Sequence, residues 1–460
     1  MTDTKDARTL VDKGSERRAR KTASRPGLLL AWQPPGLASD GDDRAPVGAS
    51  LTVGRGEGCG LRVGDPRLSG EHFRIRARAR SCEIEDLAST NGTWLDGHRL
   101  RPGQPRALPV RALIRAGESV LVFEAAADEL LDDSLAGEGE QLGMAGRFHV
   151  APMLRQVKEA ALSRRPPLIT GPSGVGKELA ARALAKLWGA SALVRHNVSA
   201  SSPPEEMSRA LFGVAPKAFT GVAASDGLLV SCAKDGAALF LDEIHNLSAP
   251  AQSTLLTVIE DKRFSRKGAE DTIVEADVRL VFASNSPDEI KDDLKARLWR
   301  VSLGSLRERL ADVPRILTAV LGAHLAAQDL DPTPVLDALD GDLVHELCLR
   351  IHTEDLFGAS NVRGLTDMAD RVAARHAAGT DATASLDTVF DELLVAGGLD
   401  LAGDADAASQ YEEQRELLSA VYLGCGKNAK LTVELVKRAG FPWSISRRHL
   451  TRYLEQWGVK

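Results

Sequence analysis

The sequence predicts a multidomain protein with an all-β sandwich, then an α/β domain, then a small all-α domain. A chain of 460 residues is long enough for three domains. Residues 26–125 hold short apolar alternations with frequent Gly and Pro and no long helical period, which is the pattern of a sandwich. Short apolar runs at 168–170 and 237–241 are typical of buried parallel strands, and a Gly-rich loop and a helical pattern follow the first. From residue 411 onward, apolar residues at helical spacing and a local excess of Lys and Arg predict a helical domain.

Composition places the chain among soluble globular proteins. It is 43% hydrophobic and 27% charged with a formal net charge of −6, and no stretch approaches the length of a membrane helix. An odd number of cysteines without CxxC pairs argues for reduced thiols and against disulfides or zinc. We therefore expect a cytoplasmic protein with no membrane partner. The cysteines are Cys59, Cys82, Cys232, Cys348 and Cys425.

The N-terminal module is predicted to consist of short strands at roughly ten-residue spacing. A polar, basic tail precedes it over residues 1–25, and an acidic linker with Gly and Ser follows it over 126–142. LLLAW within it is too short for the core of a signal sequence. The expected strands carry the sequences LTVGR, LRVGD, FRIRARA, CEIEDL, TWLDG and SVLVFE.

The segments GR, SGEH and STNGT in residues 26–125 resemble the signature of a forkhead-associated (FHA) domain, which binds phosphothreonine peptides. Phosphothreonine brings nearly two negative charges and several acceptor oxygens, which suit Arg55 and the Ser69 hydroxyl. The resemblance implies that Thr90 and Asn91 hold the phosphate and the peptide backbone, while His72 braces the loop. It points to a phosphothreonine-containing protein or a Ser/Thr kinase as partner. The alternative is a sandwich that has lost ligand binding.

A phosphate-binding loop is predicted after the apolar run at 168–170. Its glycines let the backbone wrap an anion, and the amides at the start of the following helix, expected over Glu178–Leu187, would point at that anion. Lys177 would reach the outer phosphates of ATP. The ATP-binding residues are expected to be Gly171, Pro172, Ser173, Gly174, Val175, Gly176, Lys177 and Glu178.

Two carboxylates follow the second apolar run, at the end of a predicted strand. Open α/β sheets put their chemistry at the carboxyl ends of strands. Asp242 can hold Mg²⁺ through water, and Glu243 can polarise the attacking water. Two solvated carboxylates after a core strand are the alternative, but the upstream phosphate loop favours hydrolysis of ATP with Mg²⁺.

Residues 143–375 resemble the AAA+ domain of bacterial sigma-54-dependent transcription activators, whose phosphate loop characteristically carries Glu after the lysine. The resemblance implies an α/β P-loop fold with a helical lid from about residue 311. The matching segments are Asp235–Gly268, Leu211–Val222, Asp292–Leu298, Ser305–Val313 and Asn361–Leu365.

The same resemblance implies roles for four further residues. Asn197 would restrain Glu243 until the nucleotide is correctly placed, and Asn285 would be a first sensor beside the γ-phosphate. Arg363 would be a second sensor on the lid. Arg297 would be an arginine finger that reaches the neighbouring subunit's site, since a guanidinium is always charged and binds phosphate through two donors. The implied assembly is a homo-oligomeric ring, expected to be a hexamer.

The loop that grips the sigma factor in this family would carry Phe219, Thr220 and Gly221 at its tip. Here it reads KAFTGV where the family has GAFTGA, so Lys217 and Val222 replace smaller residues. A surface hairpin without a partner is the alternative for this segment.

Lys291 stands where the family has its first arginine finger, and it keeps the charge but loses the two-donor fork. Gly358-Ala359-Ser360 replaces the family's Trp-Pro-Gly ahead of the second sensor. These departures leave the expectation of ATP binding the strongest of the three. The expectation of hydrolysis is weaker, and that of productive contact with sigma-54 is the weakest.

The C-terminal segment 411–460 resembles a Fis-type helix-turn-helix that binds double-stranded DNA, after an expected linker over 376–410. It holds nine Lys and Arg against five Asp and Glu, and Leu450, Leu454 and Trp457 give a buried stripe. A helical bundle with a basic face is the alternative. The N-terminal end of a recognition helix reaches base edges, so the DNA-binding residues would be Ser446, Arg447, Arg448, His449 and Arg452.

The combined interpretation is a bacterial transcription regulator that binds upstream DNA. It would use ATP hydrolysis in an AAA+ ring to remodel sigma-54 RNA polymerase for promoter opening, under control of a phosphothreonine signal. One alternative is a DNA-binding, phosphopeptide-responsive regulator that binds ATP with weak or no hydrolysis. Another is an AAA+ regulator that acts on a target other than sigma-54.

Overall fold

The computed structural model describes residues 24–37, 42–198, 203–215, 225–266, 269–399 and 419–427, together with 432 and 435. Two groups of expected functional residues lie outside the described residues: the sigma-contact residues Phe219, Thr220 and Gly221, and the DNA-binding residues Ser446, Arg447, Arg448, His449 and Arg452.

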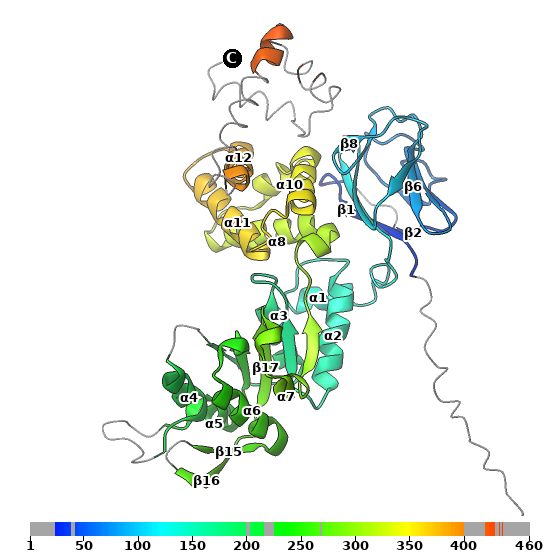
Figure 1. The fold of residues 1–460 in the computed structure, drawn as a ribbon. Coiled ribbons are helices and arrows are strands. Elements are labelled where there is room, and N and C mark those ends of the chain that lie inside the picture. Colours follow the sequence, from blue (N-terminus) through cyan, green and yellow to red (C-terminus); the bar gives the residue numbers. More distant parts are fainter. Residues whose placement is uncertain are drawn as a thin grey trace, which may run out of the picture.

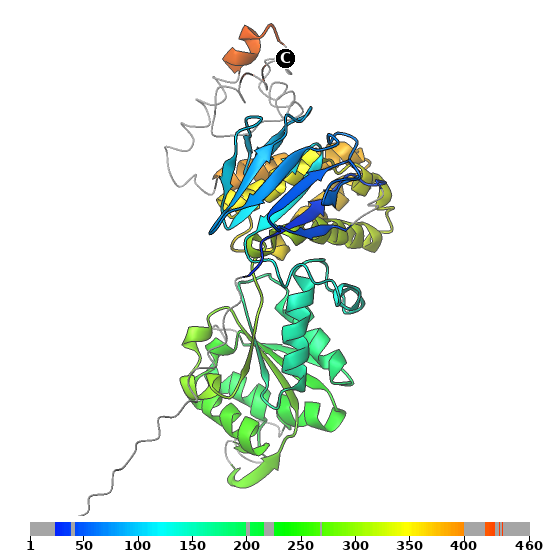
Figure 2. The same ribbon diagram turned by 90° about the vertical axis from the view of Figure 1, so that its right-hand side faces the viewer.

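The N-terminal module is a sandwich of two antiparallel-rich sheets, as the sequence predicts (Figures 1 and 2). One sheet has the strand order β2-β1-β11-β10-β7-β8 and the other β4-β3-β5-β6-β9. Phe73, Ile75 and Ile114 fill the space between them without solvent exposure. The strands are β1 (Gly27–Trp32), β2 (Arg44–Pro46), β3 (Ser50–Gly54), β4 (Leu61–Arg62), β5 (Phe73–Ala77), β6 (Cys82–Asp86), β7 (Thr93–Leu95), β8 (His98–Arg99), β9 (Arg106–Leu108), β10 (Arg111–Ala116) and β11 (Ser119–Glu124).

The central module is a parallel sheet in the order β13-β14-β17-β12-β18 with helices packed on it (Figure 1). The apolar runs of the sequence form β12 (Pro167–Thr170) and β14 (Ala238–Asp242), the latter with four of its five residues buried. Every strand pairing in this sheet is parallel, which confirms the α/β prediction. The other strands are β13 (Leu193–Asn197), β17 (Arg279–Ser284) and β18 (Trp299–Ser302).

Further elements surround the sheet. Ser248 caps α6 by accepting a hydrogen bond from the amide of Ala251. The remaining elements are α1 (Ala136–Gln141), α2 (Val150–Leu162), α3 (Lys177–Leu187), α4 (Pro204–Phe212), α5 (Gly227–Asp235), η2 (Ile244–Asn246), α6 (Ala249–Asp261), the β15 (Arg263–Arg266) and β16 (Ala269–Glu275) hairpin, η3 (Pro287–Glu289), α7 (Asp292–Lys295) and η4 (Arg307–Asp312).

A helical lid follows the sheet. It extends beyond the expected boundary at residue 375, because α12 packs against α11 and α9 with Leu386, Val389 and Phe390 buried. The first part of the expected linker 376–410 therefore belongs to the lid. The helices are α8 (Val313–Ala327), α9 (Thr333–Asp337), α10 (Gly341–Glu354), α11 (Val362–Ala377) and α12 (Ala382–Leu399).

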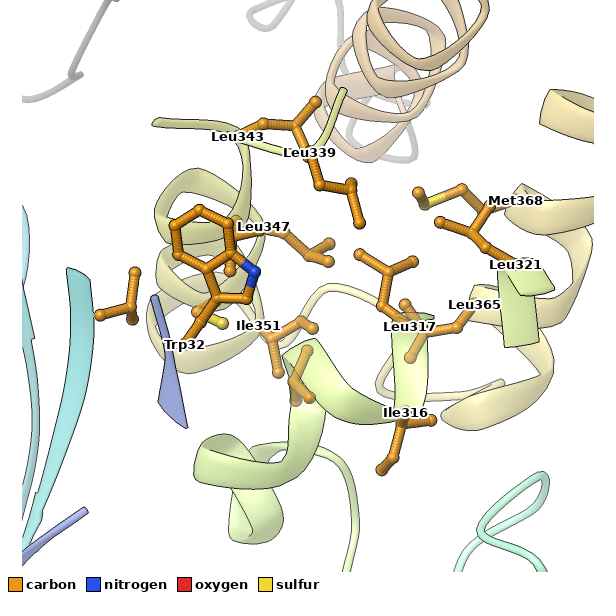
Figure 3. Packing of buried hydrophobic residues seen from close by; sticks show 14 of the residues in the cluster. Trp32, Ile316, Leu317, Leu321, Leu339, Leu343, Leu347, Ile351, Leu365 and Met368 are labelled. Carbon is orange, nitrogen blue, oxygen red and sulfur yellow. The ribbon is translucent and has the colours of Figure 1, made fainter. Parts of the chain in front are cut away.

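The sandwich and the lid share one apolar core (Figure 3). Trp32, Leu113 and Val122, from the outer face of the first sheet, pack in the same cluster as Leu317 and Leu347 of the lid. In Figure 3 the Trp32 ring lies against α10 and beside the lid side chains. The two modules, far apart in the sequence, therefore form one packed unit in this structure.

Within the described residues, one helical stretch, Arg307–Ala327, is long and apolar enough to cross a membrane, with a mean hydropathy of 1.3. Its apolar character has a local explanation, since Leu310, Ile316, Leu317 and Leu321 pack in the core shared by sandwich and lid.

Candidate functional site

The phosphate loop connects β12 to the first turn of α3. Gly174 and Gly176 have φ angles of +73° and +101°, a region that glycine adopts without strain. Lys177 is 8% exposed, and its Nζ donates to the carbonyl oxygens of Gly171 and Pro172, each at 3.0 Å. The backbone thus curves around the start of a helix, where an anion is favoured.

Lys177 lies within the electrostatic reach of three other predicted site residues. Burial lowers the pKa of Lys177, the carboxylates of Glu243 and Asp242 oppose that effect, and Arg363 adds to it. The fold therefore brings Lys177, both carboxylates and the lid arginine to one place, although they come from three separate segments.

The acidic pair stands at the carboxyl end of β14. Glu243 has a φ of +56°, which is uncommon for a residue with a side chain and is typical of functional positions. Its amide donates to Asp242 Oδ1 at 3.1 Å. Glu243 Oε2 lies 3.5 Å from His245 Nδ1, which also lies 3.1 Å from Ser284 Oγ. The turn after β14 thus carries two adjacent, half-buried carboxylates.

Asn197 ends β13 and Asn285 directly follows β17, and these two strands flank β14. Asn197 pairs in register with Asp242 and is exposed, while Ser286 Oγ donates to Asn285 Oδ1 at 3.2 Å. The partner of Glu243 among the described side chains is His245, and no contact joins it to Asn197. The proposed restraint of Glu243 by Asn197 is therefore absent from the described contacts.

The two candidate finger residues contact α6 of their own chain. Arg297 is exposed, and its Nε donates to Glu260 Oε1 at 2.6 Å. Lys291 Nζ donates to the carbonyl of Ala249 and to Ser253 Oγ, both at 3.0 Å. Within the described part of the chain, no contact joins either side chain to the phosphate loop of its own subunit.

The lid lies directly on the phosphate loop at the start of α11. Asn361, 1% exposed, donates from Nδ2 to the Ser173 carbonyl at 3.0 Å and accepts at Oδ1 from the Leu306 amide at 3.0 Å. The Val362 amide donates to the Gly174 carbonyl at 3.1 Å. A Cβ on Gly174 would lie 1.8 Å from a backbone oxygen of this segment, so only glycine permits the contact. The start of α11 and the phosphate loop are thus in direct backbone and side-chain contact.

In the sandwich, the predicted phosphopeptide residues gather on adjoining loops. The amide of Thr90 donates to Ser69 Oγ at 3.1 Å, and the two hydroxyl oxygens lie 3.5 Å apart. Asn91 Nδ2 donates to the Arg67 carbonyl at 2.6 Å, and the amide of Arg55 donates to the Ser69 carbonyl at 3.0 Å. Arg55, Thr90 and Asn91 are exposed residues, so these loops are open to solvent where a phosphate could approach.

His72 braces these loops from beneath. It is fully buried, accepts from the Ser69 amide at Nδ1 (3.0 Å), and lies 3.0 Å from the Gly92 carbonyl at Nε2. Burial lowers the pKa of His72, so the neutral ring with a proton on Nε2 satisfies both contacts.

Comparison with known proteins assigns both regions. Residues 145–304 match the sigma-54 interaction domain family, and residues 51–117 match the FHA domain family. The chain contains a sigma-54 interaction domain and an FHA domain. The first is an AAA+ ATPase domain, which accounts for the phosphate loop and the acidic pair.

The relatives are transcription regulators. The formate hydrogenlyase transcriptional activator FhlA of Escherichia coli is 31% identical over 267 residues, or 55% of this chain and 38% of FhlA. The transcriptional regulatory protein RtcR of Escherichia coli is 36% identical over 181 residues, or 36% of this chain and 33% of RtcR. The Nif-specific regulatory protein of Rhodobacter capsulatus is 37% identical over 175 residues, or 36% of this chain and 30% of that protein. The chain thus spans less than two fifths of each relative.

Two residues of the AAA+ site were missed by sequence reasoning. Asn361, which joins the lid to the phosphate loop, lies in the matching segment Asn361–Leu365, but the sequence assigns it no role. Arg195 joins Glu178 to Asp242 with contacts of 2.6 and 3.1 Å. The signal for Arg195 was present, since an arginine in a strand two residues before Asn197 lies on the same face of that strand.

Proposed function

We propose that the chain is an ATP-driven transcription activator that acts on sigma-54 RNA polymerase and is controlled by phosphothreonine recognition in its FHA domain. The observation that carries this proposal is the convergence of Lys177, Asp242, Glu243 and Arg363 in a region that matches the sigma-54 interaction domain. In the cytoplasm, the segment 411–460 would hold it on double-stranded DNA. Ser/Thr phosphorylation would supply the signal in this two-component-like signalling.

The residues present fit ATP with Mg²⁺. Mg²⁺ is usually held by one or two carboxylates together with substrate phosphates and waters, and Asp242, with its side chain 13% exposed, is one such carboxylate. When bound, Mg²⁺ would neutralise phosphate charge. Lys177 and the loop amides would hold the phosphates, and Glu243 would accept a proton from the attacking water.

Assembly would complete the site. In a ring, Arg297 could leave Glu260 and reach the phosphates bound by the next subunit, since that ion pair is exposed and such pairs contribute little stability. The expected ring is a hexamer, and hydrolysis would move the loop with Phe219, Thr220 and Gly221. The exposure of Arg297 supports a role between subunits.

The deciding experiment is capture of purified sigma-54 by the full-length protein with ADP and aluminium fluoride, which mimic the transition state of hydrolysis. Wild type is compared with Thr220→Ala. Capture by wild type that the variant loses supports the activator. ATP turnover without capture favours another target, and ATP binding in rings without turnover favours the regulator that lacks a motor.

Control by phosphothreonine is supported by contacts that lead from the peptide-binding loop to the lid. Asp65, just ahead of Ser69, accepts at Oδ2 from the amides of Glu118 and Ser119 at 2.7 and 3.1 Å. Arg67 in the same loop pairs with Glu118 at 2.7 Å. The loop that would bind phosphothreonine therefore holds the β10–β11 turn.

The β10–β11 turn also contacts the lid. A Cβ on Gly341, at the start of α10, would lie 2.1 Å from the Glu118 carbonyl oxygen, so the helix and the turn are in close backbone contact. Arg115 pairs with Asp342 at 2.5 Å beside it. Since the lid also holds the phosphate loop through Asn361, we infer that peptide and nucleotide occupancy bias the same element, which is the requirement for coupling between two sites.

A further inference from the structure

Arg195 connects two carboxylates that belong to different parts of the AAA+ site. It lies on β13, in register with Phe240 of β14, and Asn197 two residues later is in register with Asp242. Its Nη1 donates to Glu178 Oε2 at 2.6 Å and its Nη2 to Asp242 Oδ2 at 3.1 Å. One guanidinium therefore joins the first turn of α3 to the acidic end of β14.

Glu178 occupies the position where an ordinary phosphate loop places a Ser or Thr hydroxyl on Mg²⁺. Here both of its oxygens are engaged by arginines: Oε2 by Arg195, and Oε1 by Arg182 Nη2 at 2.7 Å. Arg182 is one helical turn away on α3 and makes no described contact with Asp242. Arg195 is the arginine of this pair that reaches the strand.

Asp242 is held from two sides. Its Oδ1 accepts from the Glu243 amide at 3.1 Å, and its Oδ2 accepts from Arg195. The Asp242 side chain is 13% exposed, against 46% for Arg195, so the carboxylate is the more enclosed partner. Two donors in different directions fix the plane of a carboxylate, and a guanidinium supplies this geometry while a lysine ammonium acts as a point charge.

We propose that Arg195 is a positioning residue for Asp242, and that its charge offsets Glu178 and Asp242 so that ATP can bind without full dependence on Mg²⁺. This rests on the proposed ATPase function. Opposite charges within a few ångströms interact strongly in a partly desolvated site. Without Arg195, two adjacent carboxylates would repel the phosphates, and Mg²⁺ would have to compensate for both.

The test measures the dissociation constant of ATP for the full-length protein by calorimetry, with Mg²⁺ and with EDTA. The quantity compared is the ratio of the value in EDTA to the value in Mg²⁺. In Arg195→Ala this ratio is expected to grow by about three- to tenfold, because binding without Mg²⁺ weakens most. Arg182→Ala is the matched control, since it removes an equal charge from Glu178 but leaves Asp242 in place, and its ratio should stay near wild type.

Two further variants separate charge from geometry. Loss of the positioning contact to Asp242 should also lower ATP turnover in Arg195→Ala. Arg195→Lys should restore the ratio but not the turnover, because lysine keeps the charge but loses the fork. Glu178→Gln should reduce the effect of Arg195→Ala in the double variant, since one of the two uncompensated charges is then absent.

An unchanged ratio in Arg195→Ala, or an equal change in Arg182→Ala, would overturn the proposal. Failure of wild type to bind ATP in either buffer would instead sink the proposed function, because the Arg195 comparison requires a binding site. Circular dichroism spectra of all variants verify that the fold is kept.

Discussion

The lid has two faces that differ in chemistry. Toward the FHA domain it packs mainly through apolar side chains: Leu317 is fully buried in one core with Leu113 and Val122 of the FHA sheet, and the Arg115–Asp342 ion pair adds a polar contact. Toward the phosphate loop it is polar, with the Asn361 side chain and the Val362 amide hydrogen-bonded to loop carbonyls. Burial contributes about 25 cal/mol per Å² of apolar surface, whereas a hydrogen bond that water can replace contributes about 0.5–1.5 kcal/mol net.

The difference indicates which contact can open. Separating the lid from the FHA domain would expose a large apolar surface to water, while separating it from the phosphate loop would exchange a few hydrogen bonds for bonds with water. The FHA domain and the lid should therefore move as one body, and the movable joint should lie at Asn361.

The largest expected effect is the loss of ATP turnover in Glu243→Gln. Because this variant should bind ATP without hydrolysing it, the polar contact between lid and phosphate loop can be studied with ATP in place. Loss of the proton acceptor should reduce turnover by about 10²- to 10⁴-fold and leave ATP binding intact. Steady-state hydrolysis and calorimetry would measure the two quantities. Unchanged turnover would contradict the assignment of Glu243.

Leu113→Ala breaks the apolar face. Deleting a buried leucine should cost about 2–5 kcal/mol and lower the melting temperatures of the FHA domain and the lid together, because both lose the same core. Val110→Ala is the matched control on a side chain that is 76% exposed. A melting transition that shifts for the FHA domain alone would show that the two are not one body.

Asn361→Ala breaks the polar face, with a smaller expected cost of about 1–3 kcal/mol, because a buried carbonyl and amide lose their partner. Hydrogen exchange at the start of α11 should become faster, while the FHA–lid core keeps its protection. Thr366→Ala, at a half-buried position of the same helix, removes a hydrogen bond within the helix only and serves as control. Equal deprotection of both faces would contradict the comparison.

Much of the fold and of both sites could be predicted because their residues come in contiguous motifs. The Gly-rich loop, Asp242 and Glu243 after a buried run, and the Ser69 and Thr90 loops each carry local geometry that needs no knowledge of distant contacts. Contacts between modules could not be read in this way, since the Asn361–Ser173 hydrogen bond joins residues 188 positions apart.

One signal for the FHA–lid interface was present but was interpreted otherwise. LLLAW in β1 and VLVF in β11 are continuous apolar runs in antiparallel strands, where one solvated face would give alternation. Such runs indicate strands covered on both faces. As a sequence, LLLAW is considered only as the core of a signal sequence. In the structure the lid supplies the cover that these strands require, and Trp32, Leu113 and their neighbours pack against it.

The most direct measurement is the affinity of the full-length protein for phosphothreonine with and without bound ATP. The probe is a pool of peptides with one phosphothreonine between mixed residues, against the same pool unphosphorylated. Gly341→Ala places a Cβ 2.1 Å from the Glu118 carbonyl oxygen and should separate α10 from the β10–β11 turn. Gly322→Ala is the matched control, because its Cβ would meet nothing within 4 Å.

If the lid joins the two sites, ATP should change the peptide affinity of wild type and of Gly322→Ala by about 5-fold or more, and the peptide should change ATP affinity by the same factor. Gly341→Ala should bind both ligands with little or no mutual effect. Phosphopeptide affinity that is the same with and without ATP in wild type would contradict the account.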